Sequence, residues 1–312
     1  MYGLRRTTTG SNNVAMGYAS LITNTTGIGN VALGHNSLYA STTGTQNVAV
    51  GMNSVRYNTT ASYNTAVGDK AMETNTTGTN NTALGHQALN KNTTGGLNTA
   101  LGLNALYNNT TSSQNTAVGH TALFANTTGG FNTAMGYKAG EAVTTGSGNA
   151  FFGLRAGAGT TTGTANTFIG GSSNSYVGFA NTTGANNTAV GTDALAANTT
   201  ASNNTAVGMD ALDANTTGPA NTAVGAGALT TNITGADNTA LGQNSLGLST
   251  GGSNTGVGQS SLANTTGGSN TAIGRKSGDT LTTGGNNTLL GHDAQPSSVG
   301  VSKEITLGNG SI

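Results

Sequence analysis

The sequence contains no cysteine and no tryptophan, and only 6% of its 312 residues are charged. The absence of cysteine excludes a disulfide framework and thiolate chemistry. The 10 Lys and Arg residues are scattered and the formal net charge is zero, so the basic patch that nucleic acids or anionic lipids require is lacking. No apolar run approaches the ~20 residues of a membrane helix, and the first residues do not resemble a secretory signal. We therefore expect neither nucleic-acid binding nor membrane insertion.

Aromatic residues are also scarce, at 4%, whereas glycine is abundant, with 51 residues. Such a composition, taken alone, is typical of low-complexity or disordered segments. The sequence nevertheless repeats itself with a strict period, and a disordered chain has no reason to keep an apolar residue at one phase. Repetition with a short, fixed period indicates a stacked repeat architecture.

The repeat has the consensus N-T-A-V-G-x-x-A-L, followed by a turn that is commonly N-T-T-G. Its period is 17 residues, apart from one step of 21 and two steps of 16. When the first Asn is counted as position 0, the 17 repeats start at Asn13, Asn30, Asn47, Asn64, Asn81, Asn98, Asn115, Asn132, Asn149, Asn166, Asn187, Asn204, Asn221, Asn238, Asn254, Asn270 and Asn287.

Five positions of the repeat vary little. Position +4 is Gly in every copy and position +3 is always apolar, whereas +2 is mostly Ala, +7 is Ala or Ser, and +8 is usually Leu, Val or Met. Positions +5 and +6 accept almost any residue. The structural anchors of four central repeats are Asn64, Val67, Gly68, Asn81, Leu84, Gly85, Asn98, Leu101, Gly102, Asn115, Val118 and Gly119.

This pattern predicts two short β segments per coil, at +1 to +3 and at +6 to +8. Both are too short for helices, and Gly, Asn and Thr are poor helix formers. Gly at +4 predicts a positive φ or a close approach of two backbones. We expect the Asn at position 0 to stack on the Asn of the next coil as an amide ladder. We also expect the +3 and +8 columns to form a continuous apolar core.

The sequence therefore predicts an all-β fold, a repetitive parallel β-solenoid or β-roll of about 17 coils. Its core is thin, because about two apolar side chains per coil contribute ~1.5–3 kcal/mol each when buried. Ordering the chain costs ~1.5 kcal/mol per residue. The small residues at +2 and +7 are therefore interpreted as the contact between chains, and a homotrimer is expected.

Departures from the repeat suggest the domain organisation. The predicted segments are a partial first coil (1–12), a ten-repeat block (13–170), an insertion-loop coil (171–186), a seven-repeat block (187–294), and a capping strand or join to a further C-terminal domain (295–312). In the insertion, Tyr176 and Phe179 are candidate surface contacts.

Three repeats, those starting at Asn132 to Asn166, exchange bulky and small positions. The apolar residue at +8 becomes Gly140, Gly157 and Asn174, while phenylalanine enters at +2 as Phe151 and Phe168. We interpret this exchange as movement of the bulky side chain from one segment of the coil to the other.

The unit N-T-A-V-G-x-x-A-L-x-x-N-T-T-G resembles repeats in the long tail fibres of bacteriophages. Residues 304–312, E-I-T-L-G-N-G-S-I, resemble the segment that leads into the self-cleaving chaperone domain at the end of many such fibres. The unit is also similar to the S-V-A-I-G repeats in the heads of trimeric autotransporter adhesins, which are left-handed parallel β-rolls with three chains around one axis. These resemblances imply a trimeric fibre on a virion tail or, alternatively, on a bacterial surface.

All four histidines, His35, His86, His120 and His292, occupy position +5. The nearest two lie two coils apart, about 10 Å at ~4.8 Å per coil, too far to share one metal ion. We expect exposed variable positions and no metal site, although three symmetry-related histidines on a trimer axis are an alternative.

The recurring N-T-T is formally a glycosylation acceptor, at Asn24, Asn75, Asn126 and Asn215. Turn residues that hydrogen-bond their own backbone are the preferred interpretation. Rows of Thr are also a feature of ice-binding solenoids, but the Thr pair of this repeat lies in a turn of changing composition, which disfavours a flat ice-binding face.

No Ser/His/Asp grouping, paired carboxylates or phosphate-binding loop stands out, so we expect no catalytic residues, no cofactor and no enzymatic activity. The hypothesis from sequence is a structural fibre protein, the shaft of a phage tail fibre that presents a receptor-binding tip. Its partners would be copies of itself and a host glycan or protein receptor. The alternatives are an adhesin head and a self-polymerising extracellular filament.

Overall fold

The computed structural model describes residues 6–308, which contain 18 strands of three residues each and no helix. The chain divides into two compact units, Met1–Phe152 and Gly153–Ile312. Unit 1 contains β1 (Val14–Met16), β2 (Val31–Leu33), β3 (Val48–Val50), β4 (Thr65–Val67), β5 (Thr82–Leu84), β6 (Thr99–Leu101), β7 (Thr116–Val118), β8 (Thr133–Met135) and β9 (Ala150–Phe152).

Unit 2 has the same construction. Its strands are β10 (Thr167–Ile169), β11 (Thr188–Val190), β12 (Thr205–Val207), β13 (Thr222–Val224), β14 (Thr239–Leu241), β15 (Thr255–Val257), β16 (Thr271–Ile273), β17 (Thr288–Leu290) and β18 (Ile305–Leu307).

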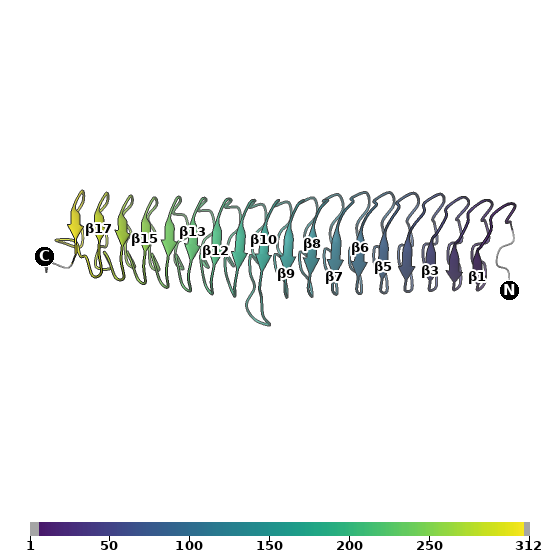
Figure 1. Cartoon of the computed structure of the whole chain (residues 1–312), viewed down its shortest axis with the longest axis horizontal. Coiled ribbons are helices and arrows are strands. Elements are labelled where there is room, and N and C mark those ends of the chain that lie inside the picture. Colours follow the sequence, from purple (N-terminus) through teal and green to yellow (C-terminus); the bar gives the residue numbers. More distant parts are fainter. Residues whose placement is uncertain (1–5, 309–312) are drawn as a thin grey trace. The chain divides into compact units, whose positions relative to one another are not determined.

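Within each unit, every strand pairs in parallel with the strand of the next coil (Figure 1). The register keeps equivalent positions together, so that Ala66 lies beside Ala83 and Val67 beside Leu84. The 16-residue coil between β14 and β15 preserves this alignment, with Leu241 beside Val257. The predicted all-β parallel solenoid with a 17-residue period is therefore confirmed, and each column of the sequence is a column in space.

The core of each coil is formed by positions +2, +7 and +8. In the coil of Asn64, Ala66, Ala71 and Met72 are all 0% exposed. The prediction that +3 contributes to the core is wrong, because Leu84 and Leu101 remain 45% and 40% exposed. Side chains alternate along a strand, and since Asn at position 0 and Ala at +2 face inward, +1 and +3 must face outward.

The small residues at +2 and +7 are buried too, so the interpretation that they form the contact between chains is wrong. Ala at +2 and Ala or Ser at +7 are enclosed within a single chain, as Ala83 and Ala88 illustrate at 0% exposure. They are small because they share a thin interior with the Leu side chain at +8. These columns are not accessible to another chain.

The predicted second β segment is absent, since positions +6 to +8 form turns in the described coils other than those of Asn166 and Asn287, where they form no strand either. Gln87 and Leu89 adopt φ values of 55° and 53°, in the left-handed region, so the segment curls where a strand would extend. The Leu89 N–H still donates to the Ala105 carbonyl of the next coil at 2.9 Å. Full burial of the Leu89 side chain, worth ~1.5–3 kcal/mol, offsets the left-handed conformation.

Glycine at +4 meets both of the predicted requirements. Gly85 has a φ of 138°, and a Cβ atom placed there would lie 2.6 Å from the Gly102 carbonyl oxygen in the next coil. A side chain at this position would therefore force adjacent coils apart.

The exchange of bulky and small positions compensates for volume, as predicted. A Cβ atom at Gly140 would lie 2.7 Å from the Phe151 ring, and one at Gly178 would lie 2.5 Å from the Phe168 ring. Each phenylalanine thus fills space that Leu at +8 occupies elsewhere. Gly178, rather than the predicted Asn174, takes the +8 place, because the extra residues form a loop ahead of it.

The stack continues beyond residue 294, where the seven-repeat block was predicted to end. Ile305 pairs with Thr288 in β17, and Glu304 takes the position of the anchor Asn. The predicted capping segment therefore contributes an eighteenth strand. Residues 1–5 and 309–312 of the two predicted terminal segments lie outside the described residues.

Candidate functional site

A ladder of buried asparagine side chains follows position 0 through each unit. The Asn81 Nδ2 atom donates to the Asn64 Oδ1 atom at 3.2 Å, and the Asn81 backbone N–H donates to the same oxygen at 3.0 Å. The predicted anchors Asn64, Asn81, Asn98 and Asn115 are all part of this ladder and at most 1% exposed. Each amide thus satisfies buried polar groups in its own coil and in the preceding one.

A second ladder, which sequence reasoning missed, runs along position +11. The Asn92 Nδ2 atom donates to the Asn75 Oδ1 atom at 2.7 Å and to the Gly95 carbonyl oxygen at 2.9 Å. The same carbonyl accepts the Asn81 Nδ2 atom at 2.9 Å, so one oxygen joins the two ladders. The signal in the sequence was the recurrence of Asn at +11, which was interpreted as a turn residue.

The asparagines that are formal glycosylation acceptors belong to the second ladder and are buried. Asn24, Asn75, Asn126 and Asn215 are 0% exposed, and the Nδ2 atom of each donates to a carbonyl oxygen three residues later. A glycosyl transferase cannot reach these atoms in the folded chain.

The exposed surface of the strands presents positions +1 and +3, which we call the outer strand face. In the 17 coils that start with Asn, position +1 is Thr, Val or Ala, position +3 is apolar, and neither carries a charge. The most exposed +3 side chains of these coils, between 36% and 60% exposed, are Met16, Leu84, Leu101, Met135, Ile169, Leu241, Ile273 and Leu290. The predicted anchors Val67 and Val118 also belong to this face and are partly exposed.

Position +5 forms a second external column, with rings that stack between coils. The ring centroids of Tyr18 and His35 are 5.3 Å apart, as are those of His120 and Tyr137. The His86 Nε2 atom lies 3.4 Å from a carboxylate oxygen of Asp69. Among residues 6–308, no group of three or more His, Asp or Glu side chains is arranged to hold a metal ion.

The insertion forms a loop that projects from the coils of unit 2 beside β10 (Figure 1). Its backbone is closed by a hydrogen bond from the Ser172 N–H to the Ser175 carbonyl. The Tyr176 ring lies 5.0 Å from the Phe179 ring and 5.3 Å from the Arg155 guanidinium, measured between centres. The two predicted surface residues therefore contact each other, and Phe179 is partly open to solvent.

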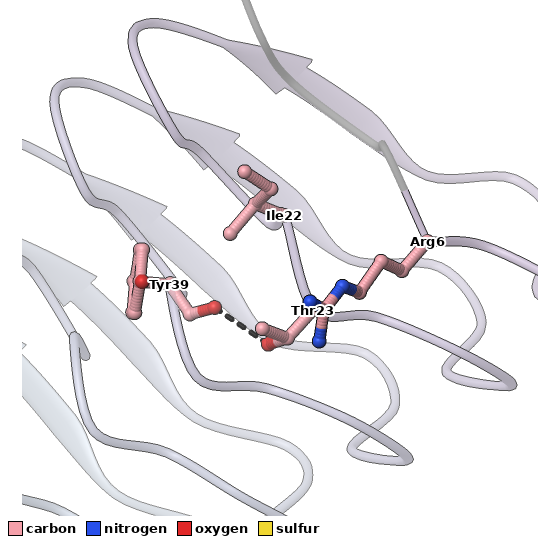
Figure 2. A pocket seen from close by; sticks show the side chains of 4 residues that line it. All are labelled: Arg6, Ile22, Thr23 and Tyr39. Atoms are coloured by element: carbon pink, nitrogen blue, oxygen red, sulfur yellow. Dashed lines mark hydrogen bonds between the residues drawn. The ribbon is translucent and has the colours of Figure 1, made fainter.

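Among the described residues, grooves that are partly open to solvent lie on the coil surfaces, and two of them are lined as follows. The first, of about 460 Å³, is lined by Arg6, Ile22, Thr23 and Tyr39, and the Thr23 hydroxyl within it donates to the Tyr39 carbonyl at 2.6 Å (Figure 2). The second, of about 510 Å³ in unit 2, has Asp210 as its one charged residue. The residues that line these two grooves do not pair an acid with a base.

Two carboxylates have perturbed acidity. Burial raises the pKa of Asp213 above its usual value of 3.8, and the neighbouring carboxylates of Asp193 and Asp210 raise it further. Hydrogen bonds from the Ser297 hydroxyl and N–H and from the Thr306 hydroxyl lower the pKa of the Glu304 carboxyl. Because the pKa values of Asp213 and Glu304 are shifted in the folded chain, the free energy of unfolding depends on their protonation.

These features define a repeat protein of the parallel β-solenoid class, stabilised by amide ladders. No protein-family model and no curated protein sequence matches the chain. The described residues contain no helix that is long and apolar enough to cross a membrane.

Proposed function

We propose that this chain is a structural fibre protein, a shaft segment of a phage tail fibre that holds a receptor-binding tip away from the particle. The observation that supports it is the unbroken parallel pairing in each unit, in which successive rungs stack in the same register. Nine strands at ~4.8 Å spacing extend one unit by about 40 Å. Such an array gives length and stiffness with few residues per rung.

The proposed assembly is a homotrimer in the virion tail fibre. The projecting loop with Tyr176 and Phe179, together with the variable +5 and +6 positions, is the proposed contact with a host glycan or protein receptor. Exposed aromatic rings are suited to either partner, since they bury a large area with little loss of conformational entropy.

Electron microscopy of the purified chain tests the fibre proposal. Rods of one length and one thickness are the expected result, whereas compact particles would contradict a shaft. Filaments that grow with time would favour the self-polymerising alternative. An adhesin head on a bacterial surface is the remaining alternative, and a C-terminal membrane anchor encoded in the full-length gene would favour it over the fibre.

A further inference from the structure

We infer that the outer strand face is the surface through which copies of this chain pack against one another. This inference rests on the proposed fibre function. It assigns the contact between chains to an accessible surface, because the Ala columns that were predicted to form it are enclosed. Its members are the +1 and +3 side chains, which the alternation along each strand turns outward.

The first argument is area. Four +3 side chains of unit 1, Met16, Leu84, Leu101 and Met135, are between 40% and 60% exposed. Together they give roughly 400 Å² of accessible apolar surface, within the ~300–600 Å² of the largest patch on a typical monomer. The neighbouring +1 methyl groups of Thr and Val add to this surface. A standard stable interface buries ~800 Å² per partner, so these four +3 side chains alone supply about half of that area.

The second argument is shape. The face is a narrow strip that repeats on each rung, and a globular partner could cover only a few rungs of it. A second copy of the chain has the same rung spacing, so each contact formed on one rung recurs on the next, as in stacked cross-β interfaces. A copy of the chain therefore matches the strip along the length of each unit.

The third argument concerns the alternative occupants. The absence of charge on this face disfavours nucleic acids and polyanionic glycans. An ice lattice would require equal side chains at equal spacing, and position +3 instead varies among Val, Leu, Met, Ile and Phe. Packing between side chains tolerates that variation.

The test uses two double variants of unit 2 that differ in the face they change. Leu241→Lys/Ile273→Lys places charges on the outer strand face, where the native side chains are 48% and 45% exposed. Ile233→Lys/Leu248→Lys is the matched control, with side chains that are 50% and 59% exposed at +12 and +10. Circular dichroism first verifies that both variants retain the fold. We expect this because all four substituted positions are exposed.

Native mass spectrometry and sedimentation then measure association. The expected result is an oligomer for the wild type and the control, and at least tenfold weaker association for the face variant. An oligomer of undiminished affinity in the face variant would overturn the inference but leave the fibre proposal standing. A monomeric wild type would overturn the inference and the trimer, and rod formation would then decide the fibre proposal separately.

The absence of cysteine allows a direct probe of the contact. Leu84→Cys on the outer strand face is expected to form disulfide-linked pairs on mild oxidation. Thr77→Cys, at an exposed +13 position of a preceding coil, is expected not to form them. Preferential linkage through Thr77→Cys would place the contact elsewhere. A further outcome is a monomeric wild type that shows thermal hysteresis. If Leu241→Lys/Ile273→Lys abolished that hysteresis, the face would be assigned to ice binding instead.

Discussion

At the scale of single residues, the amide ladders explain where polar groups remain unsatisfied. The Oδ1 atoms of Asn24, Asn126 and Asn232 are buried without a hydrogen-bond partner. In each case the +11 position of the next coil holds another residue, namely Ser41, Val143 and Ser249. An interrupted ladder therefore leaves an acceptor without its donor, which costs ~1–3 kcal/mol.

Ser41→Asn is predicted to stabilise unit 1. A new Nδ2 group would supply Asn24 Oδ1, and the new Oδ1 would accept Asn58 Nδ2, which now makes a long 3.4 Å bond to the Ser41 hydroxyl. We expect the free energy of unfolding to rise by about 1 kcal/mol, as measured by denaturant titration. Ser41→Ala is the control and should lower it. No gain from Ser41→Asn would show that the site cannot hold the larger side chain.

Asp213→Asn is predicted to stabilise unit 2 at neutral pH. Because the folded-state pKa is raised, the folded chain binds the proton more tightly than the unfolded chain. The free energy of unfolding therefore falls as the pH rises from about 3.8 through the raised pKa, and this loss is complete above it. The difference in Tm between variant and wild type should be positive at pH 7 and shrink towards pH 3.

The matched control for this prediction is Asp237→Asn, at an exposed position of the same unit. The gain in Tm at pH 7 should be larger for Asp213→Asn than for this control. A Tm difference for Asp213→Asn that persists at pH 3 would mean that something other than the carboxylate charge is responsible.

At the scale of the coil, the sequence predicts some features well and others poorly, for a physical reason. The period, the Asn ladder and the Gly85 conformation follow from residue types that have few alternatives, and all three are confirmed. The predicted core column at +8 is confirmed by residues such as Leu89, whereas the one predicted at +3 is wrong because apolar character there was equated with burial. Side chains alternate between the two faces of a strand, and because the polar Asn at position 0 is buried, +2 faces inward and +3 faces outward.

The second segment of the coil shows a further limit. Residues such as Leu89 have no intrinsic preference for positive φ, so no local signal marks +6 to +8 as turns. The geometry arises from closing a coil of 17 residues around a thin core. The outer strand face, too, could be recognised only once the direction of each side chain was known.

Gly140 and Phe151 are predicted to be coupled energetically. Gly140→Leu alone should destabilise unit 1 by about 1–3 kcal/mol, because the new side chain would overlap the Phe151 ring. Phe151→Ala alone should cost about 3–5 kcal/mol through the cavity it leaves. The double variant should cost less than the sum by more than 1 kcal/mol in a double-mutant cycle. Additive losses would mean that the two positions do not exchange volume.

At the scale of the whole molecule, stability is distributed along the chain. Each coil contacts its neighbours, so stability is close to a sum of coil and interface terms. With so thin a core and so few charges, the chain gains little from long-range electrostatics. If chains pack along the outer strand face as proposed, this association would add a large share of the stability of the assembly.

The thermal midpoint is accordingly predicted to depend on protein concentration. Association of folded chains stabilises the folded state by mass action, so a hundredfold dilution should lower Tm by a few degrees. Differential scanning fluorimetry across concentrations measures this shift. Leu241→Lys/Ile273→Lys should remove the dependence, and Ile233→Lys/Leu248→Lys should retain it. A Tm that is independent of concentration in the wild type would instead mean that the ladders and the Ala-Leu core stabilise one chain unaided.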